Sequence, residues 1–146
     1  MYRKFCVCVI CIALASCTTY HGLAPLSPDR VATTAEISPY FKWKPSDKKS
    51  VKYDFIIYAV SWKGDTALPG ESIYYKEGLN NPEHKIDFKL ELGKSYLWAV
   101  RVRDGDTVEA WSKFDFSAYY IFGYAQLRNH LYLLEVISKN EKSAEF

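Results

Sequence analysis

From residue 31 to about residue 117, apolar and polar residues alternate in short runs that are separated by Pro, Gly, Asp and Asn. Alternation with a period of two places every second side chain on the same face of a β-strand. Short alternating runs with turn residues between them are typical of an all-β sandwich. The pattern predicts about seven strands, at residues 31–35, 37–43, 51–61, 71–76, 84–90, 95–104 and 108–117.

The same alternation predicts which side chains face the interior of the sandwich. Large apolar side chains recur on one face of the second, third and sixth predicted strands, and we expect them to form the core: Ile37, Phe41, Trp43, Tyr53, Phe55, Ile57, Tyr96, Trp98, Val100 and Val102. The opposite face of the third and sixth strands is also largely apolar, at Ile56, Tyr58, Val60, Leu97 and Ala99. An exposed sheet face is normally polar, so another segment should cover these residues.

Residues 118–146 follow the sandwich as an extension that begins with an apolar tract. Its apolar residues either cover the outer sheet face or bind a partner, and the candidate partner-binding residues are Tyr119, Tyr120, Phe122, Tyr124, Leu127, Leu131 and Leu134. Leu127, Leu131 and Leu134 have the spacing of one face of a helix, whereas the tyrosine-rich start suits a continued strand. The pattern leaves both structures open.

The first residues carry a different signal. Arg3 and Lys4 precede an apolar run of about ten residues, which ends in Leu14-Ala15-Ser16-Cys17. A basic start, a short apolar run and small residues before a cleavage point describe a secretory signal, and the run is too short to span a bilayer as a helix, which takes about 20 residues. With a Cys at the cleavage point, this segment resembles a bacterial lipoprotein signal.

The lipoprotein resemblance implies that Cys17 becomes the first residue of the mature chain. Its sulfur and its amino group would carry acyl chains such as palmitate, which together anchor a protein stably to a membrane. Because Thr18, and not Asp, follows Cys17, the resemblance implies the outer membrane of a Gram-negative cell. The sequence then divides into a signal peptide (1–16), a flexible tether (17–27), the sandwich (28–117) and the extension (118–146).

Composition narrows the remaining classes of function. Three of the four cysteines lie in the signal, so the folded part has no Cys for a disulfide or a Cys-based metal site. Cleavage before Cys17 would remove two of 19 basic residues and leave them balanced against 17 acidic ones. A nucleic-acid partner requires a basic excess and is therefore not expected. Aromatic residues make up 16% of the chain, which favours strands.

Several motifs resemble the fibronectin type III family over about residues 28–117. Phe41-Lys42-Trp43-Lys44-Pro45 and Tyr53-Asp54-Phe55-Ile56-Ile57-Tyr58 resemble its second and third strands, and Leu90-Glu91-Leu92-Gly93-Lys94-Ser95-Tyr96 resembles the turn before its sixth strand. The residues from Tyr96 to Arg103 match the sixth strand, and Trp111-Ser112 the start of the last. The resemblance implies an immunoglobulin-like sandwich, a Tyr96 hydroxyl that binds the preceding turn, and a binding or spacer role without catalytic residues.

Other candidate chemistry is sparse. The three histidines are far apart in the sequence, and no nucleophile or phosphate-binding motif occurs, so we expect no metal, no cofactor and no enzymatic activity. Arg101 and Arg103 alternate on the sixth strand near Trp111, which predicts a guanidinium stacked on the indole. One connection is crowded by Lys42, Lys44, Lys48, Lys49 and Lys52. Such a cluster could bind lipid phosphates or anionic glycans, but a solvated loop is the simplest interpretation.

These observations favour a lipid-anchored, non-catalytic module of the cell envelope that binds or scaffolds a protein partner. The alternative is a module that binds carbohydrate or peptidoglycan. Such a module would use exposed aromatic side chains as stacking platforms, and the candidates are Trp62, Tyr74 and Tyr75.

Overall fold

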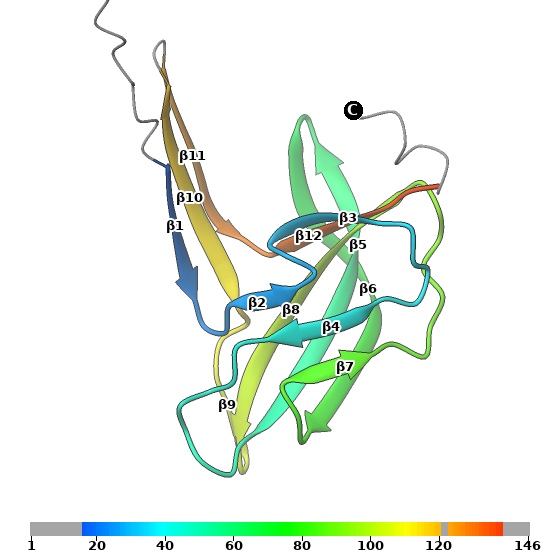
Figure 1. Cartoon of the computed structure of the whole chain (residues 1–146), viewed down its shortest axis with the longest axis vertical. Coiled ribbons are helices and arrows are strands. Elements are labelled where there is room, and N and C mark those ends of the chain that lie inside the picture. The colour runs from blue at the N-terminus through cyan, green and yellow to red at the C-terminus, as the bar shows by residue number, and fades with distance from the viewer. Residues whose placement is uncertain (1–15, 121–122, 139–146) are drawn as a thin grey trace, which may run out of the picture.

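The computed structural model describes residues 16–120 and 123–138, and for residues 16, 116–120 and 123–129 it describes the backbone alone. Twelve strands lie in this part of the chain: β1 (Ser16–His21), β2 (Pro25–Ser27), β3 (Val31–Thr34), β4 (Tyr40–Trp43), β5 (Lys52–Lys63), β6 (Thr66–Leu79), β7 (Glu83–Lys85), β8 (Lys94–Asp104), β9 (Thr107–Val108), β10 (Lys113–Tyr120), β11 (Gly123–His130) and β12 (Tyr132–Val136). None of these residues forms a helix, so no helix among them could cross a membrane (Figure 1).

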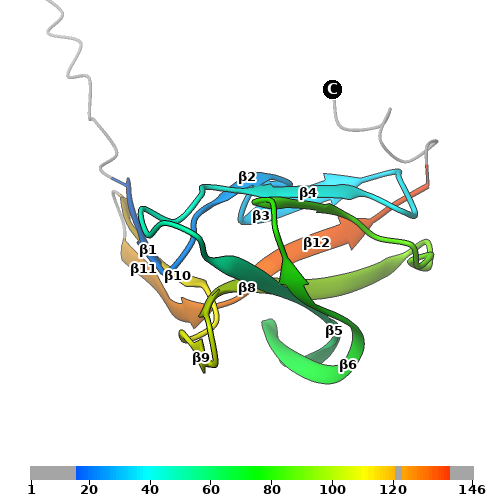
Figure 2. The same cartoon turned by 90° about the horizontal axis from the view of Figure 1, so that it is seen from below.

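Two layers of strands form a sandwich, so the fold is all-β, as the alternation predicted, and it is consistent with the immunoglobulin-like sandwich that the family resemblance implied. The smaller layer has the order β2-β4-β7, and the larger layer has the order β3-β12-β8-β5-β6 with β9 paired to β8. Figure 2 shows the two layers edge-on. β3 runs parallel to β12, whereas the other neighbours in both layers are antiparallel.

The partner of β8 in the larger layer consists of two separate pieces of chain. Near one end of β8, β9 and the residues after it follow the strand, where Glu109 N–H donates to the Val102 carbonyl and Ser112 N–H to the Val100 carbonyl, both at 2.9 Å. Near the other end, β12 pairs with residues 94–98. The hairpin β10–β11 lies between the two pieces in sequence. It leaves the sandwich and pairs with β1 in a third sheet of order β1-β10-β11, which we call the arm (Figure 1).

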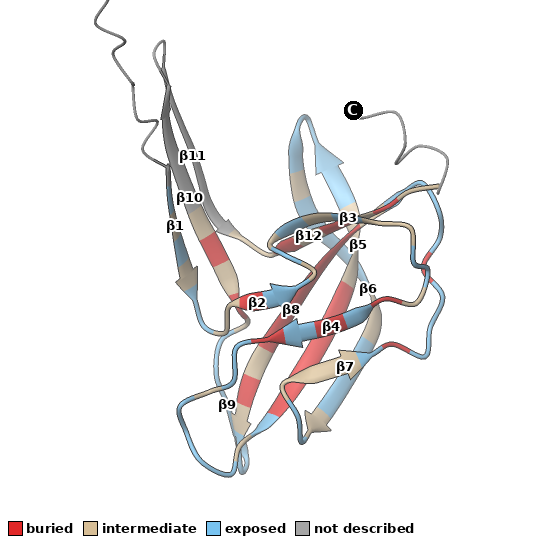
Figure 3. Cartoon of the chain, in the orientation of Figure 1, coloured by how far each residue is buried: buried red, intermediate tan, exposed pale blue. Residues whose placement is uncertain are grey.

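The core lies between the two layers, where Figure 3 shows the buried residues along β4, β5, β8 and β12. Nine of the ten residues that the alternation assigned to the core are buried. The exception is Ile37, which is 37% exposed. β4 begins only at Tyr40, because the preceding Pro39 has no N–H to donate to a sheet ladder.

Tyrosine hydroxyls fix two connections of the sandwich. Glu91 N–H donates to the Tyr96 hydroxyl at 2.9 Å, which is the bond to the turn that the family resemblance implied. The Tyr132 hydroxyl donates to the Leu23 carbonyl at 2.6 Å and joins the N-terminal segment to β12. Burial raises the pKa of Tyr132 to about 12, so its hydroxyl remains a donor at neutral pH.

The predicted flexible tether at 17–27 is wrong. All six residues of β1 pair with β10 in register, and β2 pairs with β4, so most of this segment belongs to sheets. The physical reason is that the hairpin β10–β11 supplies an edge strand, β10, whose free backbone groups β1 satisfies.

The boundary predicted at residue 117 is also wrong. β12 lies inside the larger layer, between β3 and β8, and its Tyr132, Leu134 and Val136 belong to the core. The helical alternative for Leu127, Leu131 and Leu134 is excluded, because the first lies in β11, the second between strands and the third in β12. A helix could not have completed the ladder that β3 and β8 leave open.

Candidate interaction surface

Strands and loops cover three of the five apolar residues predicted on the outer face of the larger layer, whereas Tyr58 and Val60 are half-buried and each borders a hollow. Ile56, Leu97 and Ala99 are 8%, 2% and 0% exposed. The segment that carries Trp111 follows β8 by the hydrogen bonds described above, and Leu131 joins Trp111 and Leu97 in lining one groove. Coverage of this face therefore comes from both ends of the hairpin insertion.

Asp54 is the one acidic side chain among the fully buried residues that the structure describes. It lies opposite Arg101 in the register of β5 and β8. Arg103 donates to both of its carboxylate oxygens at 2.8 Å, Arg101 Nε donates at 3.0 Å, and the Gly78 N–H donates at 3.2 Å. Because two guanidinium groups surround one carboxylate, the buried charge is fully compensated.

Arg101 also stacks on Trp111, as the sequence predicted. Its guanidinium carbon lies 4.3 Å from the centre of the Trp111 ring, within the roughly 6 Å limit for a cation–π contact. Tyr75 meets the same indole edge-on, with ring centres 6.3 Å apart. Arg103 does not share this role, because its donors reach Asp54 and, at 3.1 Å, Glu77. These contacts form one cluster, which connects β5, β6 and β8 to the loop that carries Trp111. Its members are Asp54, Tyr75, Arg101, Arg103 and Trp111.

The hydrogen bonds decide the charge state of the cluster. Burial by itself would raise the pKa of Asp54, but the bonds from Arg103, Arg101 and the Gly78 N–H outweigh it and hold the pKa below its usual 3.8. The bond to Asp54 in turn raises the pKa of Arg103. Both groups are therefore charged at neutral pH.

Replacing the carboxylate, as in Asp54→Asn, should lower the free energy of unfolding at pH 7 by about 3 kcal/mol, because it leaves two guanidinium groups without their partner. Since the folded-state pKa is lowered, the stabilisation is complete above about pH 4 and is lost as the pH falls through that lowered pKa. Urea titrations between pH 2 and 7 measure this difference. Asp65→Asn, in an exposed turn, is the control. Equal stability of Asp54→Asn and the native chain at pH 7 would contradict the prediction.

A groove of about 610 Å³ opens on the outer face, between the β5–β6 hairpin and the base of the arm. We call it the outer groove, and it is lined by Tyr58, Leu97, Trp111, His130, Leu131 and residues 66–70. Its volume lies within the roughly 300–1,000 Å³ of ligand-binding clefts, and its lining is aromatic and aliphatic with one imidazole. Such a lining suits an apolar segment of a partner or the face of a sugar ring.

The structure separates the predicted partner-binding residues. Leu131 lines the outer groove, whereas Leu134 points into the core and is 1% exposed, so it cannot bind a partner. Tyr119, Tyr120, Tyr124 and Leu127 lie on the arm, where the backbone alone is described. Phe122 lies outside the described residues.

Cys17 is exposed and free in β1, opposite Ser117 of β10. β1 therefore begins at Ser16, one residue before Cys17, which is the predicted first residue of the cleaved chain. A cut before Cys17 would leave the remaining pairs of β1 with β10 intact.

The three aromatic residues proposed as sugar platforms differ in their surroundings. Trp62 is 52% exposed and lines a second hollow of about 420 Å³ together with Phe88, which is 42% exposed. Tyr74 packs on Phe55 and on His84, and Tyr75 is engaged with Trp111. Only Trp62 of the three combines large exposure with a neighbouring hollow.

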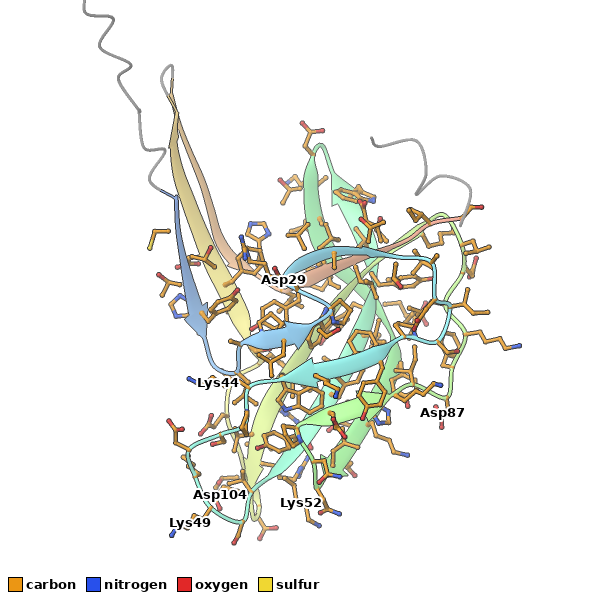
Figure 4. All side chains as sticks on the ribbon, in the orientation of Figure 1. Asp29, Lys44, Lys49, Lys52, Asp87 and Asp104 are labelled. Atoms are coloured by element: carbon orange, nitrogen blue, oxygen red, sulfur yellow. The ribbon has the colours of Figure 1, made fainter. Side chains whose placement is uncertain are left out.

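The remaining charged candidates are dispersed. His21 lies in β1 and forms a hydrogen bond with Asp115 at 3.0 Å. His84 lies in β7, in a different sheet, and its ring contacts the Tyr74 hydroxyl at 2.8 Å. No three metal-ligating side chains come together in the described part of the chain. In the lysine-rich connection, Lys48 pairs with Glu109 at 2.6 Å. Lys49, Lys52 and Asp104 are labelled at the end of the molecule opposite to the end toward which the arm points (Figure 4).

Sequence reasoning missed His130 and the β6 residues of the outer groove. The available signal was Pro69-Gly70 inside an otherwise extended segment. A Cβ at Gly70 would lie 2.8 Å from the Ala59 carbonyl oxygen, so only glycine permits this approach of β6 to β5. The register of the two strands shifts between Tyr58 and Val60, which bends the hairpin at this point.

Comparison of the chain with protein-family models, curated proteins and solved structures finds no match.

Proposed function

We propose that this chain is a lipid-anchored, non-catalytic binding module of a bacterial cell envelope, held in the outer membrane through Cys17. One observation carries the proposal: Cys17, which ends the segment that resembles a lipoprotein signal, is exposed at the start of a strand that is paired into the folded arm. A lipid on Cys17 would therefore be attached directly to folded structure, with no intervening loop.

A binding role for the module is supported by the outer groove. The groove offers aromatic and aliphatic surface beside the arm, and its walls come from segments that the buried cluster of Asp54, Arg101 and Trp111 holds in place. Preorganised apolar surface of this kind favours a protein segment as the partner. The order of the two layers supports the resemblance to fibronectin type III domains, a family of binding and spacer modules.

Intact-mass measurement of protein from native membranes tests the anchor. We expect an N-terminus at Cys17 with added acyl groups, and we expect Cys17→Ala to leave an uncleaved precursor outside the outer-membrane fraction. Alanine has no thiol to receive the lipid, while it leaves the strand pairing of β1 available. Thr18→Ala, at the next residue, is the control and should be processed normally. An unmodified native chain that starts elsewhere would rule out the anchor.

Carbohydrate or peptidoglycan binding is the second candidate function. Trp62 and Phe88 favour it, because exposed aromatic rings beside a hollow can stack on sugar rings. Titration of soluble peptidoglycan fragments, followed by tryptophan fluorescence in the native chain and in Trp62→Phe, distinguishes the two functions. A response that depends on Trp62 supports sugar binding.

A further inference from the structure

The ladder between β5 and β8 stops before either strand ends. The last pair is Ala59 with Tyr96. Residues 60–63 of β5 go on to pair with β6, and residues 94–95 of β8 pair with β12. Figure 1 shows the β5–β6 hairpin rising away from the start of β8. Among the described residues, each of these two segments therefore has a strand on one side only, and their open sides face each other.

The hollow that Trp62 lines lies at this gap. Its volume is about 420 Å³, and its walls include Ala59 and Val60 of β5 and residues 93–96 at the start of β8. Main-chain N–H and C=O groups of a strand point alternately to its two sides. The open sides of the two segments therefore present main-chain donors and acceptors to the hollow, and such groups are strong hydrogen-bonding sites.

Two exposed aromatic rings provide the apolar part of the hollow. Trp62 is 52% exposed and Phe88 is 42% exposed, and Ile73 of β6 adds an aliphatic side chain to the lining. Aromatic rings of this kind can stack on the C–H face of a sugar ring. The hollow thus combines stacking surface with open main-chain groups, which suits a ligand that is apolar on one face and polar at its rim.

The loop that carries Phe88 is held in place at both ends. The Ser38 hydroxyl donates to the Phe88 carbonyl at 3.0 Å. Farther along the loop, the Tyr96 hydroxyl accepts the bond described above, and the Gly93 N–H donates to the Val136 carbonyl at 2.6 Å. Because these bonds already fix this wall, a ligand does not have to order it on binding.

The charges around the hollow balance. Glu91 and Lys94 are the charged residues among its described lining, one of each sign. Neither an anionic nor a cationic ligand is therefore favoured by the net charge of the lining. An uncharged ligand with peptide-like hydrogen-bonding groups fits this combination.

We infer that this hollow binds a sugar that carries an N-acetylamino group, with the sugar ring stacked on Trp62 and the acetamido group hydrogen-bonded to the open main chain of β5 and β8. The inference rests on the second candidate function, sugar binding at Trp62, and names the class of sugar. An acetamido group has one N–H and one carbonyl, as a peptide unit has, so it can satisfy strand groups that have no neighbouring strand.

Calorimetric titration with three trisaccharides tests the class of sugar. The protein is the chain from residue 17 with Cys17→Ser, because a cut before this exposed residue leaves the other pairs of β1 intact. Tri-N-acetylchitotriose carries acetamido groups, chitotriose carries ammonium groups in their place, and cellotriose carries hydroxyl groups. We expect the acetylated sugar to bind with a Kd about tenfold lower than either of the others, the effect of one or two hydrogen bonds.

Variants and amide signals test the location of the site. Trp62→Ala should raise the Kd of tri-N-acetylchitotriose about tenfold through the loss of stacking. Tyr40→Ala, at an exposed aromatic residue of β4 outside the hollow, is the matched control and should bind as well as its parent. In heteronuclear NMR spectra, the amide signals of residues 60–63 and 94–95 should shift most during the titration. Thermal melting verifies that each variant remains folded.

The possible failures point to different proposals. If cellotriose binds as tightly as the acetylated sugar and depends on Trp62, sugar binding stands and the assignment to N-acetylated sugars is overturned. If none of the three sugars binds, the inference and the sugar-binding candidate both fail, while the anchor at Cys17 is unaffected.

Two other results would also overturn the inference. An acetylated tetra-alanine peptide that binds as tightly as the acetylated sugar would show that the open strands accept a peptide. Amide shifts confined to Trp111 and residues 66–70 would assign the sugar to the outer groove.

Discussion

Ending the chain at His130 should abolish the cooperative folding of the sandwich. This truncation removes β12, whose Tyr132, Leu134 and Val136 are 0%, 1% and 0% exposed. Each large buried side chain contributes about 1.5–3 kcal/mol. The sum approaches the entire stability of a typical domain, about 5–15 kcal/mol, and β3 and β8 also lose the strand between them.

Circular dichroism and urea unfolding of purified protein measure the effect of this truncation. A chain ending at Ser138 retains every described strand and should unfold with the same midpoint as the full chain. A chain ending at His130 that unfolds in one sharp transition near the native midpoint would show that β12 is dispensable.

Trp98→Ala should lower the free energy of unfolding by about 3–5 kcal/mol, and Trp43→Ala should have a similar effect. Both side chains are 0% exposed. The Trp98 ring lies 5.0 Å from Phe41 and 4.8 Å from Tyr132, measured between ring centres, so it joins β4, β8 and β12. Alanine would leave a cavity that these strands cannot fill without moving apart.

Two further substitutions separate the roles of volume and polarity. Trp62→Ala changes the same residue type at a 52% exposed position and should cost less than about 0.5 kcal/mol. Neither the Trp43 nor the Trp98 indole N–H has a hydrogen-bond partner among the described residues. Phenylalanine removes that unpaired donor, so Trp98→Phe should cost clearly less than Trp98→Ala. A loss below about 1 kcal/mol for Trp98→Ala would contradict the core packing.

Alternation predicted the central strands because charged residues such as Asp54 and Arg101 interrupt their outward face, whereas their inward face over the core contains none. The inward residues from Tyr53 to Ile57 on β5 and from Tyr96 to Val102 on β8 are all large and apolar, so the phase of each strand follows from a few positions such as Phe55 and Trp98. β12 has almost no alternation to detect, since the stretch Leu131-Tyr132-Leu133-Leu134 is apolar throughout. A continuous apolar run fits a helix or a buried strand equally well.

The contact of Arg101 with Trp111 was predictable because both residues lie close together in sequence around one hairpin. Asp54 was missed for the opposite reason. Its role depends on the register of β5 against β8, which brings it opposite Arg101 from 47 residues away. The outer groove depends on a bend of β6 and on the base of the arm, and alternation within single strands contains no information about either.

The parallel pairing of β3 with β12 has a consequence for when the chain can fold. Val31 pairs with Leu133, so strands from near the two ends of the described chain lie side by side at one edge of the larger layer. Contacts between residues so distant in sequence form slowly, because a long loop must close first. The sandwich cannot close until its last strand is present, and we expect a nascent chain to stay loosely structured until that strand emerges. If the chain is exported, as we propose, this delay would keep the polypeptide open while it crosses a membrane.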